Sequence, residues 1–566
     1  MSSVFRTRIW FLGACFIVLT LVLSAKLYTV QIVNGAAYKE RAERQYERPA
    51  ETAFNRGSIY FTNKDGSLVS AATLKTGFIL ALMPKYIEDA EKTYEVLSQI
   101  LEIDKDDFLK KAVKKDDPYE EIARRVPSET ADEIRRAKFP GVELYSEKWR
   151  FYPANKVASD VLGIVAFKDK TLAGRYGLEK YYDDVLVRDE SDLYSNFFAE
   201  IFSNVRELGK GKPLEGDLVT TIEPNVSLFL ERELGKVVDT WGAKQAGGIV
   251  MDPYTGEIVS LIEHPSFDPN NFKEETTRVF GNALVEDVYE MGSIIKPLTI
   301  AAGLDSGAIT AKTKYNDEGQ MTIDNATISN FDGKARGTVN MQEVLNQSLN
   351  TGAVFAVNRM GKDKFRSYMK SFGLGEETGV DLPNETAGII DNLDSPRDLE
   401  YATASFGQGI AMSPLITIRA LASLANGGYL PNPHVVSKID YKVGISRTLS
   451  YDEKRRVIKS ETSEEISRML VEVVDKALLN GTVKMTNFSI AAKTGTAQIP
   501  KVGGKGYYDD RSLHSFFGYF PAYNPRFIIF LYAVEPKARY ASETLTKPFI
   551  NLVKFLISYY EVAPDR

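Results

Sequence analysis

The sequence predicts an α+β protein. A transmembrane helix is followed by a mixed domain and then by a larger domain whose antiparallel sheet is flanked by helices. Three features lead to this prediction. Segments typical of buried strands stand near both ends of residues 218–560, around a middle part that is helical in pattern. Residues 37–217 mix strand-like and helix-like segments, and residues 9–33 are predominantly apolar.

The elements of the two domains follow from the spacing of apolar residues. In the larger domain we expect a C-terminal helix over Leu545–Tyr560 and strands at Gly248–Met251, Glu257–Ile262, Ser489–Ala497, Ser515–Phe520 and Phe527–Val534. In the mixed domain we expect a strand at Gly77–Leu82 and helices at Tyr86–Leu101 and Ala131–Lys138. The glycine-rich segment Lys210–Asp217 is expected to be a linker. The predicted boundaries are a tail over 1–8, a membrane helix over 9–33, a mixed domain over 37–217 and a larger domain over 218–560.

The N-terminal segment predicts an uncleaved membrane anchor. Ile9–Ala25 carries no charged residue and follows Arg6 and Arg8. If Lys26 snorkels, the helix extends to Ile32 and reaches the roughly 20 residues that a bilayer requires. A signal peptide is the alternative, but its apolar core is usually about 7–15 residues long. The segment Leu23-Ser-Ala25 also matches a cleavage site poorly.

One face of this predicted helix carries mostly small or polar residues. Gly13, Ile17, Thr20 and Ser24 follow one another at helical spacing. Small residues let helices approach closely in lipid, so this face is expected to pack against a second membrane helix. Chance could produce the same pattern in a helix that serves only as an anchor.

Composition excludes several other classes of protein. The net charge of the 566 residues is −6, so no basic excess points to nucleic acid. Cys15 is the only cysteine, so no disulfide can form within the chain. The three histidines, His264, His434 and His514, are far apart in the sequence and show no metal-ligand spacing. We therefore expect no cofactor and no metal.

The segment Ser293-Ile-Ile-Lys296 predicts a nucleophile and its base. Residues three apart share a helix face, so Lys296 can reach the Ser293 hydroxyl. Pro297 is tolerated only in the first turn of a helix, which places Ser293 near the helix N-terminus. A serine hydroxyl is a poor nucleophile without a base. Lys296 can be that base only if burial or a nearby positive charge, such as that of Lys493, lowers its pKa.

The segment Ser348-Leu-Asn350 is the second candidate. A helical turn or loop could direct both polar side chains into a cleft. The hydroxyl could then relay a proton, and the amide could hold a substrate carbonyl. The alternative is a helix cap, because serine and asparagine are ordinary capping residues.

The segment Lys493-Thr-Gly495 is the third candidate and lies within an apolar, strand-like stretch. On a strand edge, a lysine and the hydroxyls of Thr494 and Thr496 can bind a carboxylate, and the backbone at Gly495 can pair with an extended peptide. The alternative is a surface lysine before a glycine turn. The three segments, in this order, describe a serine acyl-transferase site without histidine.

Together these segments resemble class B penicillin-binding proteins, which are membrane-anchored peptidoglycan D,D-transpeptidases. The resemblance covers nearly the whole chain. In the larger domain it also rests on Gly248–Val259, His264–Asn270, Phe406–Leu415 and Ala425–Gly428, and in the family's pedestal domain on Arg56–Ile59, Arg150–Pro153 and Tyr176–Glu179. One departure is visible, because Tyr60–Gly66 stands where the family usually has Asp-Arg-Asn-Gly.

The resemblance implies an acyl transfer in which Ser293 attacks the penultimate D-Ala carbonyl of a stem peptide and a neighbouring amine resolves the acyl-enzyme. Penicillin would acylate the same serine. The backbone N–H groups of Ser293 and Thr496 would form the oxyanion hole. The implied catalytic residues are Ser293, Lys296, Ser348, Asn350 and Lys493, and the implied substrate-binding residues are Thr494, Gly495 and Thr496.

The resemblance also implies a location and partners. The short tail would lie in the cytoplasm, a single helix would cross the plasma membrane, and both domains would be extracytoplasmic. The partners would be a multispanning glycosyltransferase and proteins of a division or elongation complex. Ser405–Ile410 and the ending Glu561–Asp565 look most like the division-specific, septal enzyme.

Several alternatives share the same motifs. A serine β-lactamase would need an added base, and the E-x-x-L-N string typical of class A enzymes is absent from the sequence. A D,D-carboxypeptidase would hydrolyse the acyl-enzyme instead of cross-linking it. The chain could also be a catalytically silent scaffold of a wall-synthesis complex, but a scaffold would not need the three motifs, which are intact in this sequence. A bifunctional enzyme with its own glycosyltransferase conflicts with the pedestal-like residues 37–217.

Overall fold

The chain forms two compact units. Unit 1 comprises Met1–Phe54 and Thr76–Trp149, and unit 2 comprises Asn55–Lys75 and Arg150–Arg566. The computed structural model describes Trp10, Ile17, Thr20, Lys26 and residues 54–168, 171–188, 214–272, 277–451, 454–501, 503–504 and 506–566. Sequence patterning suggested a different grouping, with a mixed domain over 37–217 and a larger domain over 218–560, and those boundaries stay a prediction.

The predicted membrane helix over 9–33 and the tail over 1–8 lie largely outside the described residues. Trp10, Ile17, Thr20 and Lys26 are helical. Within the part of the chain that the structure describes, no helix has both the length and the apolar character needed to cross a bilayer.

In the described stretch 76–149 of unit 1, three α-helices pack against strands. The elements of this stretch are the second half of β2 (Leu68–Leu82), η3 (Pro84–Tyr86), α3 (Ala90–Ile100), α4 (Lys105–Ala112), β3 (Glu120–Val126), α5 (Ser128–Ala137) and all but the last two residues of β4 (Val142–Phe151). The predicted helix at Tyr86–Leu101 begins later, at Ala90, because Asp89 caps it by accepting a hydrogen bond from the Lys92 N–H. Leu80, Leu97 and Phe108 belong to the buried core of this unit.

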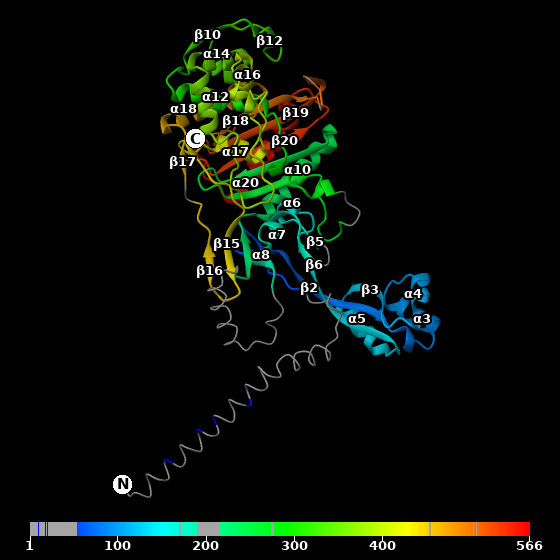
Figure 1. Ribbon diagram of the computed structural model, residues 1–566. Helices are drawn as coiled ribbons and strands as arrows, with labels where there is room; N and C mark the ends of the chain where they lie inside the picture. The colour runs from blue at the N-terminus through cyan, green and yellow to red at the C-terminus, as the bar shows by residue number, and fades with distance from the viewer. Residues whose placement is uncertain are drawn as a thin grey trace. The chain divides into compact units, whose positions relative to one another are not determined.

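Unit 2 contains the predicted antiparallel sheet, with the strand order β18-β19-β20-β8-β9. Figure 1 labels three neighbouring strands of this sheet, β18, β19 and β20. The strands are β8 (Gln245–Met251), β9 (Ile258–His264), β18 (Ala491–Pro500), β19 (Tyr507–Phe520) and β20 (Phe527–Val534), and all neighbours pair antiparallel. This confirms the prediction that strands from both sequence ends share one sheet. β18 is an edge strand of the sheet.

Helices cover both faces of this sheet. On one face, Phe516 of β19 stacks on Phe549 of α20 (Thr546–Tyr560), beside α10 (Pro224–Trp241). On the other face, the Tyr519 hydroxyl lies 2.8 Å from Ser467 of α18 (Ser460–Glu472). α17 (Pro414–Ala422) packs against β20 and β8. Successive side chains of a strand point to opposite faces, so one strand serves both layers.

The helical middle of unit 2 adds a layer of helices and two small antiparallel strand pairs. β10 (Lys314–Asp317) pairs with β13 (Gly337–Asn340), and β11 (Gln320–Ile323) pairs with β12 (Ala326–Ser329). The helices are α12 (Lys296–Asp305), α13 (Met341–Asn346), α14 (Asn350–Met360), α15 (Lys362–Ser371) and α16 (Asp398–Ala404). Figure 1 shows β10, β12, α14 and α16 gathered together.

A second sheet region of unit 2 joins segments that are distant in sequence. β1 (Ile59–Thr62) pairs antiparallel with the first part of β2 and parallel with β7 (Gly216–Thr220). β7 pairs with β15 (Val436–Tyr441), which pairs with β16 (Ser446–Thr448). Around it lie the short elements α6 (Ser159–Leu162), β5 (Val165–Lys168), β6 (Thr171–Gly174), α7 (Gly177–Tyr181) and α8 (Asp183–Leu186).

A buried ion cluster unites three of the segments that resemble the pedestal of class B penicillin-binding proteins. The Glu179 carboxylate accepts hydrogen bonds from Arg56 Nε at 2.5 Å and from Arg150 Nε at 2.6 Å, and the Tyr152 hydroxyl lies 3.2 Å away. Burial by itself raises the pKa of Glu179, but the two guanidiniums outweigh it and hold this pKa below the usual value.

We expect Glu179→Gln to lower the free energy of unfolding by about 3–5 kcal/mol, because two buried guanidiniums lose their shared counter-charge. Since the folded pKa of Glu179 is depressed, its contribution is present at neutral pH and is lost as the pH falls through that pKa. A urea titration of the purified protein measures the change. Asp363→Asn, at an exposed pair with Arg366, is the control and should cost under about 1 kcal/mol. Equal losses in the two variants would contradict the structural role of the cluster.

Candidate active site

Ser293 lies in a short 3-10 turn, Gly292–Ile295, directly before α12. The sequence predicted a helix N-terminus here, and the serine stands one turn earlier than the first α-helical residue, Lys296. Gly292 has a φ of +63°, a conformation that favours glycine, and this bends the chain into the turn. Pro297 occupies the first turn of α12, as its missing N–H requires.

The three predicted motifs meet at one point. Lys296 Nζ lies 2.9 Å from Ser293 Oγ, 3.1 Å from Ser348 Oγ and 2.6 Å from the Ser348 carbonyl. Lys493 Nζ lies 3.0 Å from the same Ser348 hydroxyl and 2.9 Å from the Thr494 carbonyl. The polar atoms therefore form a continuous path from Ser293 through Lys296 and Ser348 to Lys493.

Burial shapes the charge of both lysines. Lys296 is completely buried, and Lys493 is 4% exposed. Burial lowers the pKa of Lys296 far below its usual value, and the positive charge of Lys493 lowers it further. Burial also lowers the pKa of Lys493 to about 7. Lys296 can thus be neutral near physiological pH and can take a proton from the adjacent hydroxyl.

Lys493, Thr494, Gly495 and Thr496 lie on the edge strand β18. A Cβ at Gly495 would lie 2.4 Å from Ser515 Oγ and 2.8 Å from the Met291 carbonyl, so only glycine permits this approach of β18 to the turn that carries Ser293. The Thr496 hydroxyl accepts a hydrogen bond from the Ala541 N–H at 3.1 Å and keeps its own proton to donate.

Asn350 is the first residue of α14, and its Nδ2 donates to the Ser329 carbonyl at 2.8 Å. Its amide is thus held by β12, and its predicted role toward substrate stays a prediction. A cleft of about 1130 Å³ runs along these groups. Its lining includes Ser293, Ser329, Ser348, Asn350, Lys493, Thr494, Thr496 and Tyr540.

Two supports of the site were missed in the sequence. Ser515 is completely buried in β19, and its hydroxyl donates to the Met291 carbonyl at 2.9 Å. The available signal was a serine at the start of the predicted apolar strand Ser515–Phe520. Gly407 accepts a hydrogen bond from the Gly292 N–H at 3.1 Å, and a Cβ there would lie 2.3 Å from the Gly292 carbonyl. For Gly407, the resemblance of Phe406–Leu415 to a segment of the family was the available signal.

In the parts of the chain that the structure covers, no group of three His, Cys, Asp or Glu side chains is placed to hold a metal ion.

The chain matches two known protein families. The family described as "Penicillin binding protein transpeptidase domain" matches residues 246–553, which include Ser293 and Lys493. The chain belongs to this family. Residues 51–199 match the family described as "Penicillin-binding Protein dimerisation domain", in agreement with the resemblance noted for the pedestal segments.

Relatives of known name extend over most of the chain. Stage V sporulation protein D of Bacillus subtilis is 28% identical over 94% of this chain and 82% of its own length. The peptidoglycan D,D-transpeptidase MrdA of Acinetobacter baumannii is 27% identical over 97% of this chain and 88% of its own length. The peptidoglycan D,D-transpeptidase FtsI of Buchnera aphidicola is 26% identical over 96% and 93%.

Solved structures share the fold. Penicillin binding protein 2X of Streptococcus thermophilus has a TM-score of 0.73 at 20% identity, over 90% of this chain and 81% of its own. Penicillin binding protein 3 of Mycobacterium tuberculosis, complexed with aztreonam, has a TM-score of 0.68 at 20% identity, over 91% and 98%. The penicillin-binding protein fold is therefore common to these chains at low sequence identity.

The buried charge of Lys493 makes the stability of the fold depend on pH. Because its folded pKa is about 7 and its unfolded pKa is near 10.4, the unfolded chain binds more protons between these values, so stability rises with pH. From pH 7 to pH 9 we expect the wild type to gain about 2 kcal/mol relative to Lys493→Met, which cannot titrate. Urea titrations at the two pH values measure this difference. Parallel pH dependence of wild type and variant would contradict the burial of a titrating lysine.

Proposed function

We propose that the chain is a serine D,D-transpeptidase that cross-links peptidoglycan stem peptides through an acyl-enzyme on Ser293. The observation that carries the proposal is the 2.9 Å separation of Ser293 Oγ and Lys296 Nζ, combined with the strongly lowered pKa of Lys296. A buried neutral amine beside a serine hydroxyl is a base beside its nucleophile. Relatives from Acinetobacter and Buchnera are named peptidoglycan D,D-transpeptidases, which supports the assignment.

In the first half of the reaction, Ser293 Oγ attacks the penultimate D-Ala carbonyl, and its proton passes to Lys296 Nζ. The tetrahedral oxyanion faces the backbone N–H groups of Ser293 and Thr496, and such donors each contribute on the order of 100–1,000-fold in rate. Ser348 Oγ lies 3.1 Å from Lys296 Nζ and relays a proton to the departing D-Ala nitrogen. The C–N bond breaks, and an ester to Ser293 remains.

In the second half, an amine of a neighbouring stem peptide attacks this ester. Its proton returns through the same groups to Ser293 Oγ, and a new amide bond forms. Thr494 and Thr496 bind the carboxylate of the donor peptide, and the charge of Lys493 attracts it. Asn350 holds the substrate carbonyl. The unpaired edge of β18 can pair with the extended peptide, and Gly495 leaves that backbone accessible.

The same chemistry explains inhibition by penicillin, which imitates the D-Ala-D-Ala end and acylates Ser293. A carboxypeptidase would differ in the second half, where water replaces the amine. A β-lactamase would open a lactam ring in the first half, with no separate leaving group, and would use water in the second. The relatives include both FtsI and MrdA transpeptidases, so we propose a role in wall synthesis, septal or lateral.

Membrane attachment and the partner protein are proposed from the sequence. We propose that residues 9–33 anchor the chain in the plasma membrane, with the domains outside, and that Gly13, Ile17, Thr20 and Ser24 dock on a multispanning glycosyltransferase. Membrane fractionation tests the anchor, and recovery of the chain in the soluble fraction would contradict it.

The docking face predicts the behaviour of one double variant. Gly13→Leu with Ser24→Leu enlarges two positions where close approach is needed, so it should weaken co-purification of the glycosyltransferase in detergent. Acylation of Ser293 by penicillin should stay normal in this variant. Recovery of the partner at the wild-type yield would show that the helix serves only as an anchor.

Acylation of Ser293 tests the enzymatic proposal directly. A fluorescent penicillin should label the wild type to one equivalent and should leave Ser293→Ala and Lys296→Arg unlabelled. The first variant lacks the nucleophile, and the second lacks a base, because arginine does not deprotonate in proteins. In-gel fluorescence and mass spectrometry of the labelled peptide measure the result.

The matched control is Ser512→Ala, which removes a different serine of the same cleft and should be labelled like the wild type. Labelling of Ser293→Ala at the wild-type level would overturn the assignment of the nucleophile. An unlabelled wild type would favour the scaffold instead of the enzyme.

A further inference from the structure

Ser348, which lies between the two lysines, has an unusual backbone conformation. Its backbone φ angle is +54°, in the left-handed region that residues other than glycine rarely adopt. In this conformation both its carbonyl and its hydroxyl approach Lys296 Nζ, at 2.6 and 3.1 Å, while the hydroxyl also meets Lys493. Such strain persists only where the surrounding structure fixes the residue. The groups that fix Ser348 therefore bear on the proton path.

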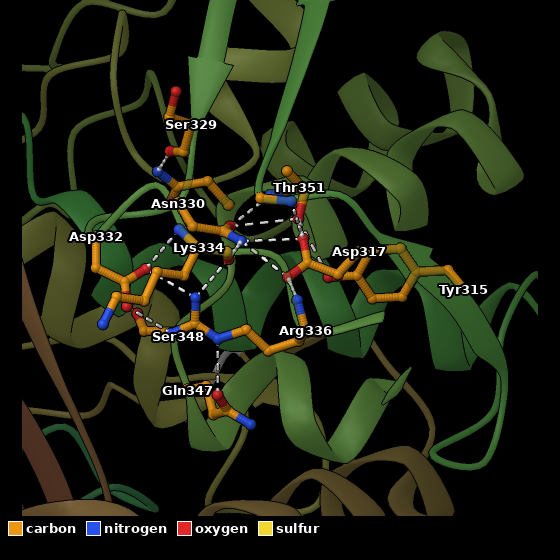
Figure 2. Close-up of polar contacts among 12 residues, drawn as sticks. Tyr315, Asp317, Ser329, Asn330, Asp332, Lys334, Arg336, Gln347, Ser348 and Thr351 are labelled. Atoms are coloured by element: carbon orange, nitrogen blue, oxygen red, sulfur yellow. Dashed lines mark hydrogen bonds and ion pairs between the residues drawn. The ribbon is translucent and has the colours of Figure 1, made fainter. Parts of the chain in front are cut away.

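The carboxylate of Asp317 is the centre of the polar network beside this residue (Figure 2). Asp317 ends β10 and is 1% exposed. Its Oδ1 accepts from Thr351 Oγ1 at 2.7 Å, and both of its oxygens accept from Asn330 Nδ2, at 2.9 and 3.1 Å. Backbone N–H groups of Gly319 and Arg336 complete the set at 3.2 and 3.0 Å.

This network holds the chain directly after Ser348-Leu349-Asn350. Thr351 donates its hydroxyl to Asp317, and its N–H to Asn330 Oδ1 at 3.3 Å. The Asn350 amide donates to the Ser329 carbonyl, one residue before Asn330. The first turn of α14 is thereby attached to β10 and to the end of β12.

The same network reaches the residue directly before the motif. Arg336 Nε donates to Gln347 Oε1 at 3.0 Å, and its two terminal nitrogens bind Asp332 at 2.7 and 2.9 Å. Figure 2 shows the Arg336 side chain between Asp332 and Gln347. Hydrogen bonding to Arg336 lowers the pKa of Asp332 to about 2, so the pair stays ionised over the working range of pH. The residues on both sides of Ser348 are thus held by groups that belong to the hydrogen-bond network of Asp317.

We propose that Asp317 is a positioning residue for acyl transfer: with Asn330, Thr351 and Arg336 it holds Ser348 in its left-handed conformation between Lys296 and Lys493. This inference rests on the proposed transpeptidase function. Asp317 does not line the cleft and acts only through the residues that it binds. Its carboxylate accepts five hydrogen bonds from four donor groups, which an amide of the same shape cannot do, because one of its two polar groups is itself a donor.

The test is the rate constant for acylation of Ser293 by a fluorescent penicillin, with folding followed by circular dichroism. Displacement of a reacting group by about 1 Å can cost about 100-fold in rate, so Asp317→Asn should slow acylation about 10- to 100-fold while the final labelling still reaches one equivalent. Thr351→Val, which removes one hydroxyl at nearly constant shape, should also slow it. Thr351→Ser, which keeps the hydroxyl, should restore a rate near the wild type.

The matched control is Asp381→Asn. Asp381 is 3% exposed and accepts from the N–H groups of Val435 and Val436 and from the Tyr182 hydroxyl, and it does not line the cleft. This variant should lose stability and keep the wild-type acylation rate. If Asp317→Asn fails to fold, the comparison of the acylation rates of Thr351→Val and Thr351→Ser tests the inference instead.

A double variant separates positioning from general destabilisation. If Asp317 acts through Ser348, its replacement should slow acylation little further in a Ser348→Ala background, because residues that act as a unit are not additive. A wild-type rate in Asp317→Asn, equal rates in the two Thr351 variants, or an equal loss in Asp381→Asn would each overturn the inference. An unlabelled wild type would instead overturn the proposed function, so the two failures are distinguishable.

Discussion

The site depends on the burial of Lys296 beside a second lysine. An ammonium group removed from water and placed near another positive charge loses its proton readily, and this is what makes a neutral amine available next to Ser293. The fold provides that burial from three directions: α12 carries Lys296, the turn before α14 carries Ser348, and the edge strand β18 carries Lys493. Without close packing of these three elements, each lysine would be an ordinary cation.

Close packing at this point depends on residues without side chains. Gly495 lets β18 approach the turn of Ser293, and Gly407 lets a second loop accept the Gly292 N–H. Ser515 then connects the turn to the sheet through the Met291 carbonyl. The nucleophile is therefore positioned by the central sheet and by the helical layer together. A site supported from both sides is better suited to hold reacting groups at fixed distances than a site on a single loop.

Much of the architecture was predictable because apolar periodicity reports burial. The strands at Gly248–Met251 and Phe527–Val534 appear nearly as predicted, and the C-terminal helix begins within a residue of the expected position. The errors lie at boundaries. The helix predicted from Tyr86 begins at Ala90 because Asp89 caps it, and β2 is longer than its apolar core because its first part pairs with β1. Caps and long-range pairing act outside the periodic pattern, so periodicity alone does not fix them.

The sequence by itself determined which residue types meet in the site. Two lysines, two serines and an asparagine in three ordered motifs predicted serine acyl-transfer chemistry, and Pro297 placed the nucleophile near a helix start. Only the tertiary structure decided how these residues meet. The left-handed turn of Ser348, the hydrogen bonds of Asp317 and the approach of Gly495 to Met291 join residues up to about two hundred positions apart. Local patterns encode local conformation, whereas the distances and pKa values of a buried site follow from packing between distant segments.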